Sequence, residues 1–183
     1  MSGARTEFAE TARRLGTELG GRGIDLVYGG GDVGLMGILA DAAMAAGVHV
    51  IGVIPEALVA REVAHHGLDE LRVVGSMHER KALMAELADG FLALPGGLGT
   101  FEELFEILTW AQLGVHRKPC AAIDVCGYFA PLDGLLARAM AEGFIIAPHR
   151  RLLIIEPTVE RALDAMAAHR PPDVESWIDP SRT

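Results

Sequence analysis

Short, continuously apolar runs alternate with helix-patterned segments along the whole sequence. The runs predict strands at residues 24–28, 48–54, 71–74, 91–94, 119–125 and 152–155. Helical periodicity predicts helices at residues 5–19, 34–46, 76–88, 100–113, 131–142 and 158–168. Strands that are apolar along their whole length belong to parallel sheets covered on both faces. The pattern therefore predicts an α/β fold, in which helices cover both faces of a Rossmann-like, doubly wound, mostly parallel sheet.

The remaining segments carry no regular pattern. Residues 56–70 read as irregular and contain His65 and His66, and residues 170–183 read as an irregular tail that includes Trp177. We find no internal repeat and no linker in the 183 residues, a length that suits one domain. We therefore expect a single nucleotide-binding α/β domain over residues 1–183.

Composition narrows the classes of partner. The formal net charge of −9 argues against a nucleic acid or an anionic membrane, since both require clustered Lys and Arg. Cys120 and Cys126 lack the spacing of a zinc site, so reduced thiols and no metal are expected. No apolar run approaches a membrane span and no signal peptide opens the chain, so we expect a cytoplasmic protein.

A first glycine-rich turn, G-G-G-D-V-G at 29–34, connects a predicted strand to a predicted helix. Glycines in such a turn let the backbone approach a phosphate at the helix N-terminus, although they can also serve only to make a tight turn. A dinucleotide site would place an acidic residue about 20 positions later, at the end of the next strand. Glu56 lies near that distance but beyond Pro55, which is a poor match.

A second turn, L-P-G-G-L-G-T-F-E-E at 94–103, again follows a strand and opens a helix. The carboxyl ends of parallel strands are where such folds bind ligands. Thr100 and Glu103 also have the spacing of a capping box, which would give Glu103 a structural role. The two roles are compatible, because a carboxylate in the first helical turn is stabilised as the anion by the helix dipole.

Cations occupy the start of the helix predicted at 76–88. Arg80 and Lys81 lie in its first turns, where the helix dipole disfavours positive charge. They predict an anionic partner, which is either Glu79 with Glu86 or the phosphate of a ligand. His78 is either a proton carrier or a hydrogen-bonded structural residue.

Together with T-W-A-Q-L-G-V-H-R-K-P at 109–119, the segments G-G-G-D-V-G-L-M-G, M-H-E-R-K and P-G-G-L-G-T-F-E-E resemble the Lonely Guy family over about residues 2–168. Its members are cytokinin riboside 5′-monophosphate phosphoribohydrolases, long misnamed lysine decarboxylases. The resemblance implies hydrolysis of the N-glycosidic bond of N6-modified AMP, with release of a free cytokinin or adenine base and ribose 5-phosphate. It also implies that no cofactor is needed.

The resemblance extends to individual residues. The family's catalytic pair falls on Arg80 and Glu103. Its phosphate and ribose contacts fall on Gly96, Gly97, Gly99 and Thr100, and also on Gly30, Gly31, Met77 and Lys81. Family members normally begin with a strand that ends in a C-G-S-S-like loop. Ser2-Gly3 resembles the end of that loop, so this first strand is expected to be missing from the sequence.

Cleavage of a C1′–N9 bond develops positive charge on the ribose. Glu103 would stabilise that charge, Arg80 would hold the ribose or Glu103, and the glycine-rich turns would bind the phosphate. The main alternative is a non-enzymatic carrier of a nucleotide or a cofactor. A lysine decarboxylase would need a pyridoxal-binding lysine, and neither Lys81 nor Lys118 has a convincing context for that role. The poor position of Glu56 argues against a third alternative, a NAD-dependent oxidoreductase.

The helix that follows Thr100 is apolar on nearly every side. Its apolar residues are Phe101, Leu104, Phe105, Ile107, Leu108, Trp110, Ala111 and Leu113. A helix of this kind must be buried on nearly every side, and one sheet covers only one face. We therefore expect a homodimer, as the family resemblance also implies. Residues 56–70 or the tail with Trp177 could instead cover the helix within one chain.

Overall fold

The computed structural model describes residues 2–59, 64–65 and 67–172. These form two compact units, Met1–Ala88 and Asp89–Thr183, and each is considered by itself. Within the described residues, no helix is long and apolar enough to cross a membrane. The expectation of one domain over residues 1–183 stays a prediction.

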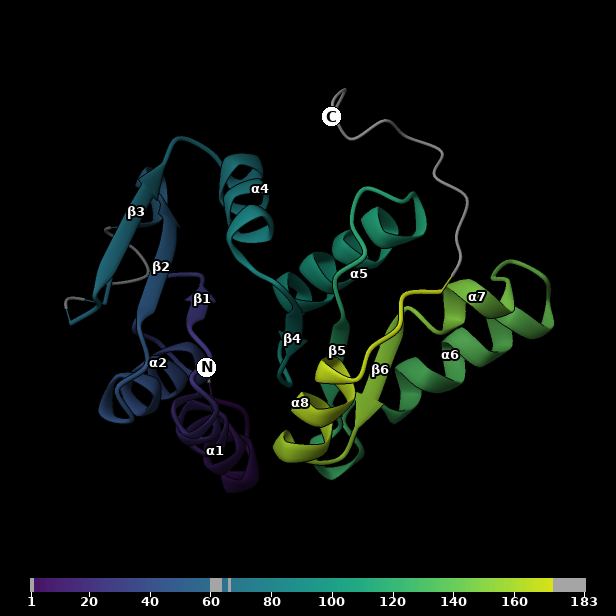
Figure 1. Cartoon of the computed structure of the whole chain (residues 1–183), viewed down its shortest axis with the longest axis horizontal. Helices are drawn as coiled ribbons and strands as arrows, with labels where there is room; N and C mark the ends of the chain where they lie inside the picture. Colours follow the sequence, from purple (N-terminus) through teal and green to yellow (C-terminus); the bar gives the residue numbers. More distant parts are fainter. Residues whose placement is uncertain (1, 60–63, 66, 173–183) are drawn as a thin grey trace. The chain divides into compact units, whose positions relative to one another are not determined.

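The first unit contains a three-stranded parallel sheet in the order β1-β2-β3. Its strands are β1 (Leu26–Tyr28), β2 (Val50–Pro55) and β3 (Glu70–Val74), and its helices are α1 (Thr6–Arg22), α2 (Leu35–Ala45), α3 (Glu56–Val59) and α4 (Met77–Leu87). Helices α2 and α4 contact the sheet, and α1 lies alongside α2 (Figure 1). The two helices approach closely at Gly16, where a Cβ would lie 2.6 Å from the backbone nitrogen of Ala43.

The second unit contains a parallel sheet in the order β4-β5-β6, whose strands lie side by side in Figure 1. The strands are β4 (Phe91–Ala93), β5 (Cys120–Ile123) and β6 (Leu153–Glu156). The helices are α5 (Leu98–Gln112), the short 3-10 turn η1 (Val125–Gly127), α6 (Ala130–Ala141), α7 (Ala147–Arg150) and α8 (Val159–Ala167).

The core of the second unit forms where α5 and α6 cover one face of this sheet. Leu104 of α5, Ala122 of β5, Phe129 and Leu153 of β6 are buried together there. Side chains alternate along a strand, so Ala121 and Ile123 of β5 point away from this core. Helix α8 packs against β5 and β6. All four residues of β5 are buried, which is why this strand is a continuous apolar run.

The predicted fold class is confirmed, since parallel sheets carry helices on both faces. Hydrogen bonds divide the strands into two sheets of three, and each has the strand order of one half of a doubly wound fold. Periodicity indicates that a strand is buried on both faces but not which strand lies beside it, so this division was not predicted.

Several helix boundaries differ from the predictions. Helix α1 continues to Arg22 and is capped by Gly23, which takes the left-handed conformation at φ 65°. The prediction that residues 56–70 are irregular was wrong at its start, where Glu56–Val59 forms the single turn α3. Helix α7 was not predicted. His66 and Trp177 lie outside the described residues.

Helix α4 begins as predicted, with one change in its capping. The hydroxyl of Ser76 accepts a hydrogen bond from the backbone N–H of Glu79 at 3.1 Å. The carboxylate of Glu79 accepts from the N–H of Gly75 at 2.7 Å, one residue before the N-cap. Ser76 and Glu79 therefore fix the start of α4 and the position of the residues that follow.

Candidate functional site

The first glycine-rich turn and the start of α4 are joined through Gly29 and Arg80. Nη2 of Arg80 donates a hydrogen bond to the carbonyl of Gly29 at 3.1 Å. A Cβ on residue 29 would lie only 1.9 Å from that same nitrogen. Glycine at this position therefore allows the guanidinium to lie directly against the backbone of the turn.

Arg80 is buried, with 6% of its surface exposed. Its Nη1 lies 3.8 Å from the sulfur of Met77, and its Nε has no hydrogen-bond partner among the described residues. These acceptors are uncharged, and a buried cation without a compensating anion is costly. Because the carboxylate of Glu79 accepts a hydrogen bond at the helix cap, the part of the alternative in which Glu79 neutralises Arg80 loses support, while the part that concerns Glu86 stays open. The arrangement favours an anionic group as the partner of this guanidinium.

The other predicted contacts of the first unit lie on the same two segments. Gly30 takes a positive φ of 73°, and Gly31 forms an isolated antiparallel bridge with Ala64. Met77 is the first residue of α4 and is 41% exposed, and Lys81 follows Arg80 in the same helix. The structure thus brings the glycine turn and the M-H-E-R-K segment together.

His65 holds the glycine turn in a way that the sequence analysis missed. Its backbone N–H donates to the carbonyl of Gly30 at 3.1 Å. Its Nε2 lies 3.0 Å from a carboxylate oxygen of Asp41 and 3.8 Å from one of Asp32, while its Nδ1 accepts from the N–H of Gly67 at 3.2 Å. Since Nδ1 accepts, Nε2 carries the proton and donates to Asp41. No local pattern signalled this contact, because the groups come from separate segments.

The second glycine-rich turn opens α5 earlier than predicted. Helix α5 begins at Leu98 with Gly97 as its N-cap, and the N–H of Phe101 donates to the carbonyl of Gly97 at 3.1 Å. Thr100 is therefore the third helical residue, and the alternative in which Thr100 and Glu103 form a capping box is wrong. Glu103 lies in the second turn rather than the first, so the helix dipole stabilises its anion less than expected.

The glycines of this turn fall into two kinds. A Cβ on residue 96 would lie 2.1 Å from the hydroxyl oxygen of Thr100, so packing within the protein requires glycine there. A Cβ on Gly97 or Gly99 would meet nothing within 4 Å, and neither glycine has a positive φ. Among the described residues, the N-cap Gly97 supplies no side-chain hydrogen bond to this end of α5. The helix start is open, and its first N–H groups are placed to receive an anion.

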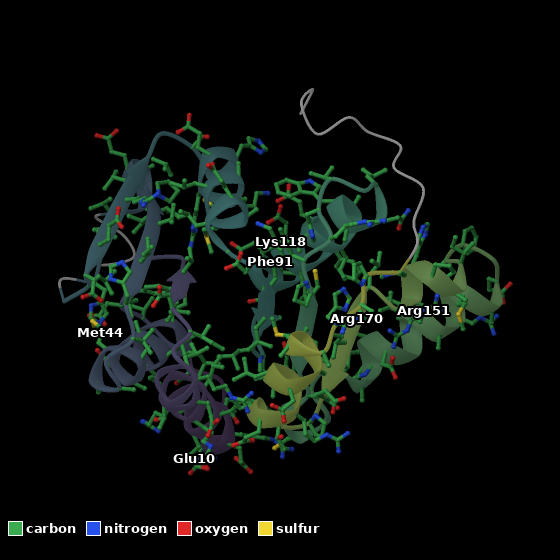
Figure 2. The ribbon with its side chains drawn as sticks, in the orientation of Figure 1. Glu10, Met44, Phe91, Lys118, Arg151 and Arg170 are labelled. Carbon is green, nitrogen blue, oxygen red and sulfur yellow. The ribbon has the colours of Figure 1, made fainter. Side chains whose placement is uncertain are left out.

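The far end of α5 is fixed by a histidine. Nε2 of His116 donates to the carbonyl of Ile107 at 3.0 Å, and its Nδ1 accepts from the N–H of Lys118 at 3.1 Å. The ring lies against Phe91, with 5.2 Å between ring centres; Figure 2 labels Phe91 and Lys118 at this place. Burial lowers the pKa of His116 below its ordinary value of 6.5. This histidine is therefore a structural group that favours the neutral ring.

Arg80 belongs to the first unit and Glu103 to the second, so their action as a pair stays a prediction. Glu56, the residue considered for a dinucleotide site, is the first residue of α3 and lies beyond the end of β2. The expected position of an acidic residue at the end of that strand is taken by Pro55.

A family described as "possible lysine decarboxylase" matches residues 36–166. The cytokinin riboside 5′-monophosphate phosphoribohydrolase LOG of Oryza sativa subsp. japonica is 51% identical over 156 residues, which are 85% of this chain and 64% of that protein. The chain belongs to the Lonely Guy family. A Lonely Guy relative from Rhodococcoides fascians, named cytokinin riboside 5′-monophosphate phosphoribohydrolase, is 49% identical over 91% of this chain and 84% of its own length. The chain thus spans just under two thirds of the rice protein and most of the bacterial one.

Solved structures of other proteins share the fold of this Lonely Guy chain. The molybdenum cofactor binding protein of Rippkaea orientalis has a TM-score of 0.67 and 21% identity, covering 90% of this chain and 88% of that one. The molybdenum cofactor carrier protein of Chlamydomonas reinhardtii has the same TM-score and identity and covers 92% of both chains. At this level of identity the likeness concerns the fold alone.

Proposed function

We propose that this chain hydrolyses the N-glycosidic bond of adenosine 5′-monophosphates, with N6-modified AMP as the preferred class. The products are the free cytokinin or adenine base and ribose 5-phosphate. The proposal rests above all on the identity of 51% and 49% with relatives that are named for this reaction. The buried guanidinium of Arg80 and the open start of α5 support it independently, since both suit an anionic ligand.

In the proposed reaction the C1′–N9 bond breaks, the oxygen of water bonds to C1′ and a proton passes to the base. The carboxylate of Glu103 stabilises the positive charge that develops on the ribose. Arg80 holds the ribose or orients Glu103. Water is the only co-reactant, and the step is proposed without a cofactor or a metal.

Binding of the phosphate is assigned to the two glycine-rich turns. Gly96, Gly97, Gly99 and Thr100 form one set of contacts, and Gly30, Gly31, Met77 and Lys81 form the other. The phosphate does not react, so its binding energy is available to position the ribose for the chemical step. A nucleoside that lacks the phosphate is therefore expected to react poorly.

Chromatography of the products tests this function directly. Purified protein incubated with AMP, isopentenyl-AMP and adenosine should release base and ribose 5-phosphate from the monophosphates, and should release base from adenosine only slowly. Comparable kcat/KM values for AMP and adenosine would contradict the role of the phosphate. Binding of a monophosphate without any release of base would instead favour a non-enzymatic carrier; one protein with the same fold is named a molybdenum cofactor carrier.

We also propose that the chain forms a homodimer. Leu104, Ile107 and Ala111 of α5 are buried within the second unit, whereas Phe105 is 41% exposed. Further apolar side chains of this unit are exposed, namely Leu98, Leu135, Met140, Phe144 and Ile146. A two-fold partner is the commonest cover for such a surface. Light scattering distinguishes a dimer from a monomer, because a mass near 19.5 kDa at micromolar concentration would show a monomer.

A further inference from the structure

Tyr128 lies next to the second glycine-rich turn, in the segment that connects β5 to α6. Its hydroxyl donates a hydrogen bond to the carbonyl of Gly96. Its ring is parallel to that of Phe101, with 6.3 Å between ring centres and 4° between planes. Phe129 packs against it edge-on, with 5.1 Å between ring centres and 88° between planes. The two ring contacts and the hydrogen bond therefore hold the hydroxyl in one place.

The backbone that carries Tyr128 is anchored to the sheet. The carboxylate of Asp124 accepts from the N–H of Phe129 at 2.6 Å, and the N–H of Asp124 donates to the carbonyl of Glu156 in β6 at 2.8 Å. The N–H of Tyr128 donates to the carbonyl of Val125 at 3.1 Å. Phe129 itself is fully buried. A side chain carried by this anchored backbone can fix the orientation of another group.

The group that it fixes is a single peptide unit. The carbonyl of Gly96 and the N–H of Gly97 belong to the same planar trans peptide, so they point in opposite directions. When the hydroxyl of Tyr128 holds the carbonyl on one side, the N–H of Gly97 is directed to the other. Gly97 has no side chain and no neighbour within 4 Å of a Cβ, so on the Gly97 side packing does not restrain the rotation of this peptide. A hydrogen bond at one end is an efficient restraint.

We propose that Tyr128 is a positioning residue that orients the N–H of Gly97 toward the phosphate of the substrate. The inference rests on the proposed function and adds to it a residue from outside the family motifs considered above. Tyr128 acts through the backbone of Gly96 and does not itself touch the reacting atoms. Its loss should weaken binding of the phosphate more than it slows the chemical step.

The test variant is Tyr128→Phe, which keeps the ring stacking and removes only the hydroxyl. The matched control is Thr17→Val on α1, which removes another hydroxyl that donates to a backbone carbonyl, that of Arg13 at 3.1 Å. Calorimetry measures the Kd of ribose 5-phosphate and of ribose. Steady-state kinetics measure kcat and KM for isopentenyl-AMP, and kcat/KM for the matching nucleoside.

For Tyr128→Phe we expect the Kd of ribose 5-phosphate and the KM of the monophosphate to rise about fivefold to tenfold, as for one misdirected donor to a charged group. The kcat should stay within about twofold, and the nucleoside kcat/KM should not change. Thr17→Val should match the wild type throughout. The proposal would be overturned if the melting temperature fell while the Kd of ribose 5-phosphate and the KM of the monophosphate stayed unchanged. Equal losses in kcat/KM for the nucleotide and the nucleoside would overturn it too.

The two proposals fail in different ways. If the wild type binds ribose 5-phosphate but releases no base, the proposed function is wrong, and the Kd comparison still tests Tyr128. If the wild type releases base and Tyr128→Phe leaves the Kd of ribose 5-phosphate unchanged, only the role of Tyr128 is wrong. If the wild type binds ribose 5-phosphate no more tightly than ribose, both are overturned.

Discussion

Gly99→Ala is expected to stabilise the protein and to weaken its ligand binding at the same time. Gly99 is the second residue of α5, and a Cβ added there would meet nothing within 4 Å. Glycine in a helix costs roughly 0.5–1 kcal/mol relative to alanine, because it loses more backbone entropy on folding. The substitution removes that cost without creating a clash.

The gain in the free energy of unfolding should therefore reach up to about 1 kcal/mol. For a chain of this length, such a gain raises the melting temperature by roughly 2–4 °C. If the open space beside Gly99 is where the phosphate approaches the helix N-terminus, a methyl group will obstruct it. A tenfold loss in kcat/KM for the monophosphate, which corresponds to about 1.4 kcal/mol, is the expected minimum.

Gly134→Ala is the matched control. Gly134 lies within α6, and a Cβ there would also meet nothing within 4 Å. Thermal melts without ligand should show a gain in stability for both variants, whereas product chromatography should show a loss of activity for Gly99→Ala alone. If both variants keep full activity, the space beside Gly99 is not used by the ligand, and the reasoning from its open surroundings fails.

Glu103→Gln and Arg80→Ala should each abolish turnover, a loss of at least about 10²-fold in kcat, while circular dichroism shows a folded protein. Since Thr100 is not the N-cap of α5, a large fall in melting temperature for Glu103→Gln would contradict the catalytic role. Ser76→Ala should lower the free energy of unfolding by about 1 kcal/mol through loss of the α4 cap, measured by urea titration. The pKa of His116 is lowered in the folded protein, so below pH 6.5 the histidine binds a proton more readily in the unfolded chain. The free energy of unfolding should therefore fall as the pH falls below 6.5. His116→Asn should flatten this slope, and an unchanged slope would show that other groups cause it.

The elements of the fold were predictable where burial leaves a periodic trace in the sequence. The continuous apolar run of β5 and the Ser76 cap of α4 are local signals, and both predictions held. Helix α7 could not be predicted, because Ala147–Arg150 is one turn and too short to show a period. The start of α5 was misplaced because the spacing of Thr100 and Glu103 imitates a capping box.

The candidate site was predictable only in its local parts. The two glycine-rich turns were recognised between a strand and a helix, and they lie there. The clamp of His65 on Gly30 and the bond from Tyr128 to Gly96 join residues 35 and 32 positions apart. Such contacts depend on which loops the sheet brings together, and one sequence carries no pattern for them.

The structure separates glycines that a sequence motif treats alike. Gly29 and Gly96 leave no room for a Cβ, because Arg80 and the hydroxyl of Thr100 occupy the space. These two positions would need glycine even in a protein that bound no ligand. Gly97 and Gly99 leave that space empty, and their backbone angles do not require glycine. Gly134 of α6 has equally open surroundings, so open space alone does not reveal a ligand. Gly97 and Gly99 differ from Gly134 because they lie at the start of a helix, where an anion can bind, and the indication of a bound anion rests on these two residues rather than on the motif as a whole.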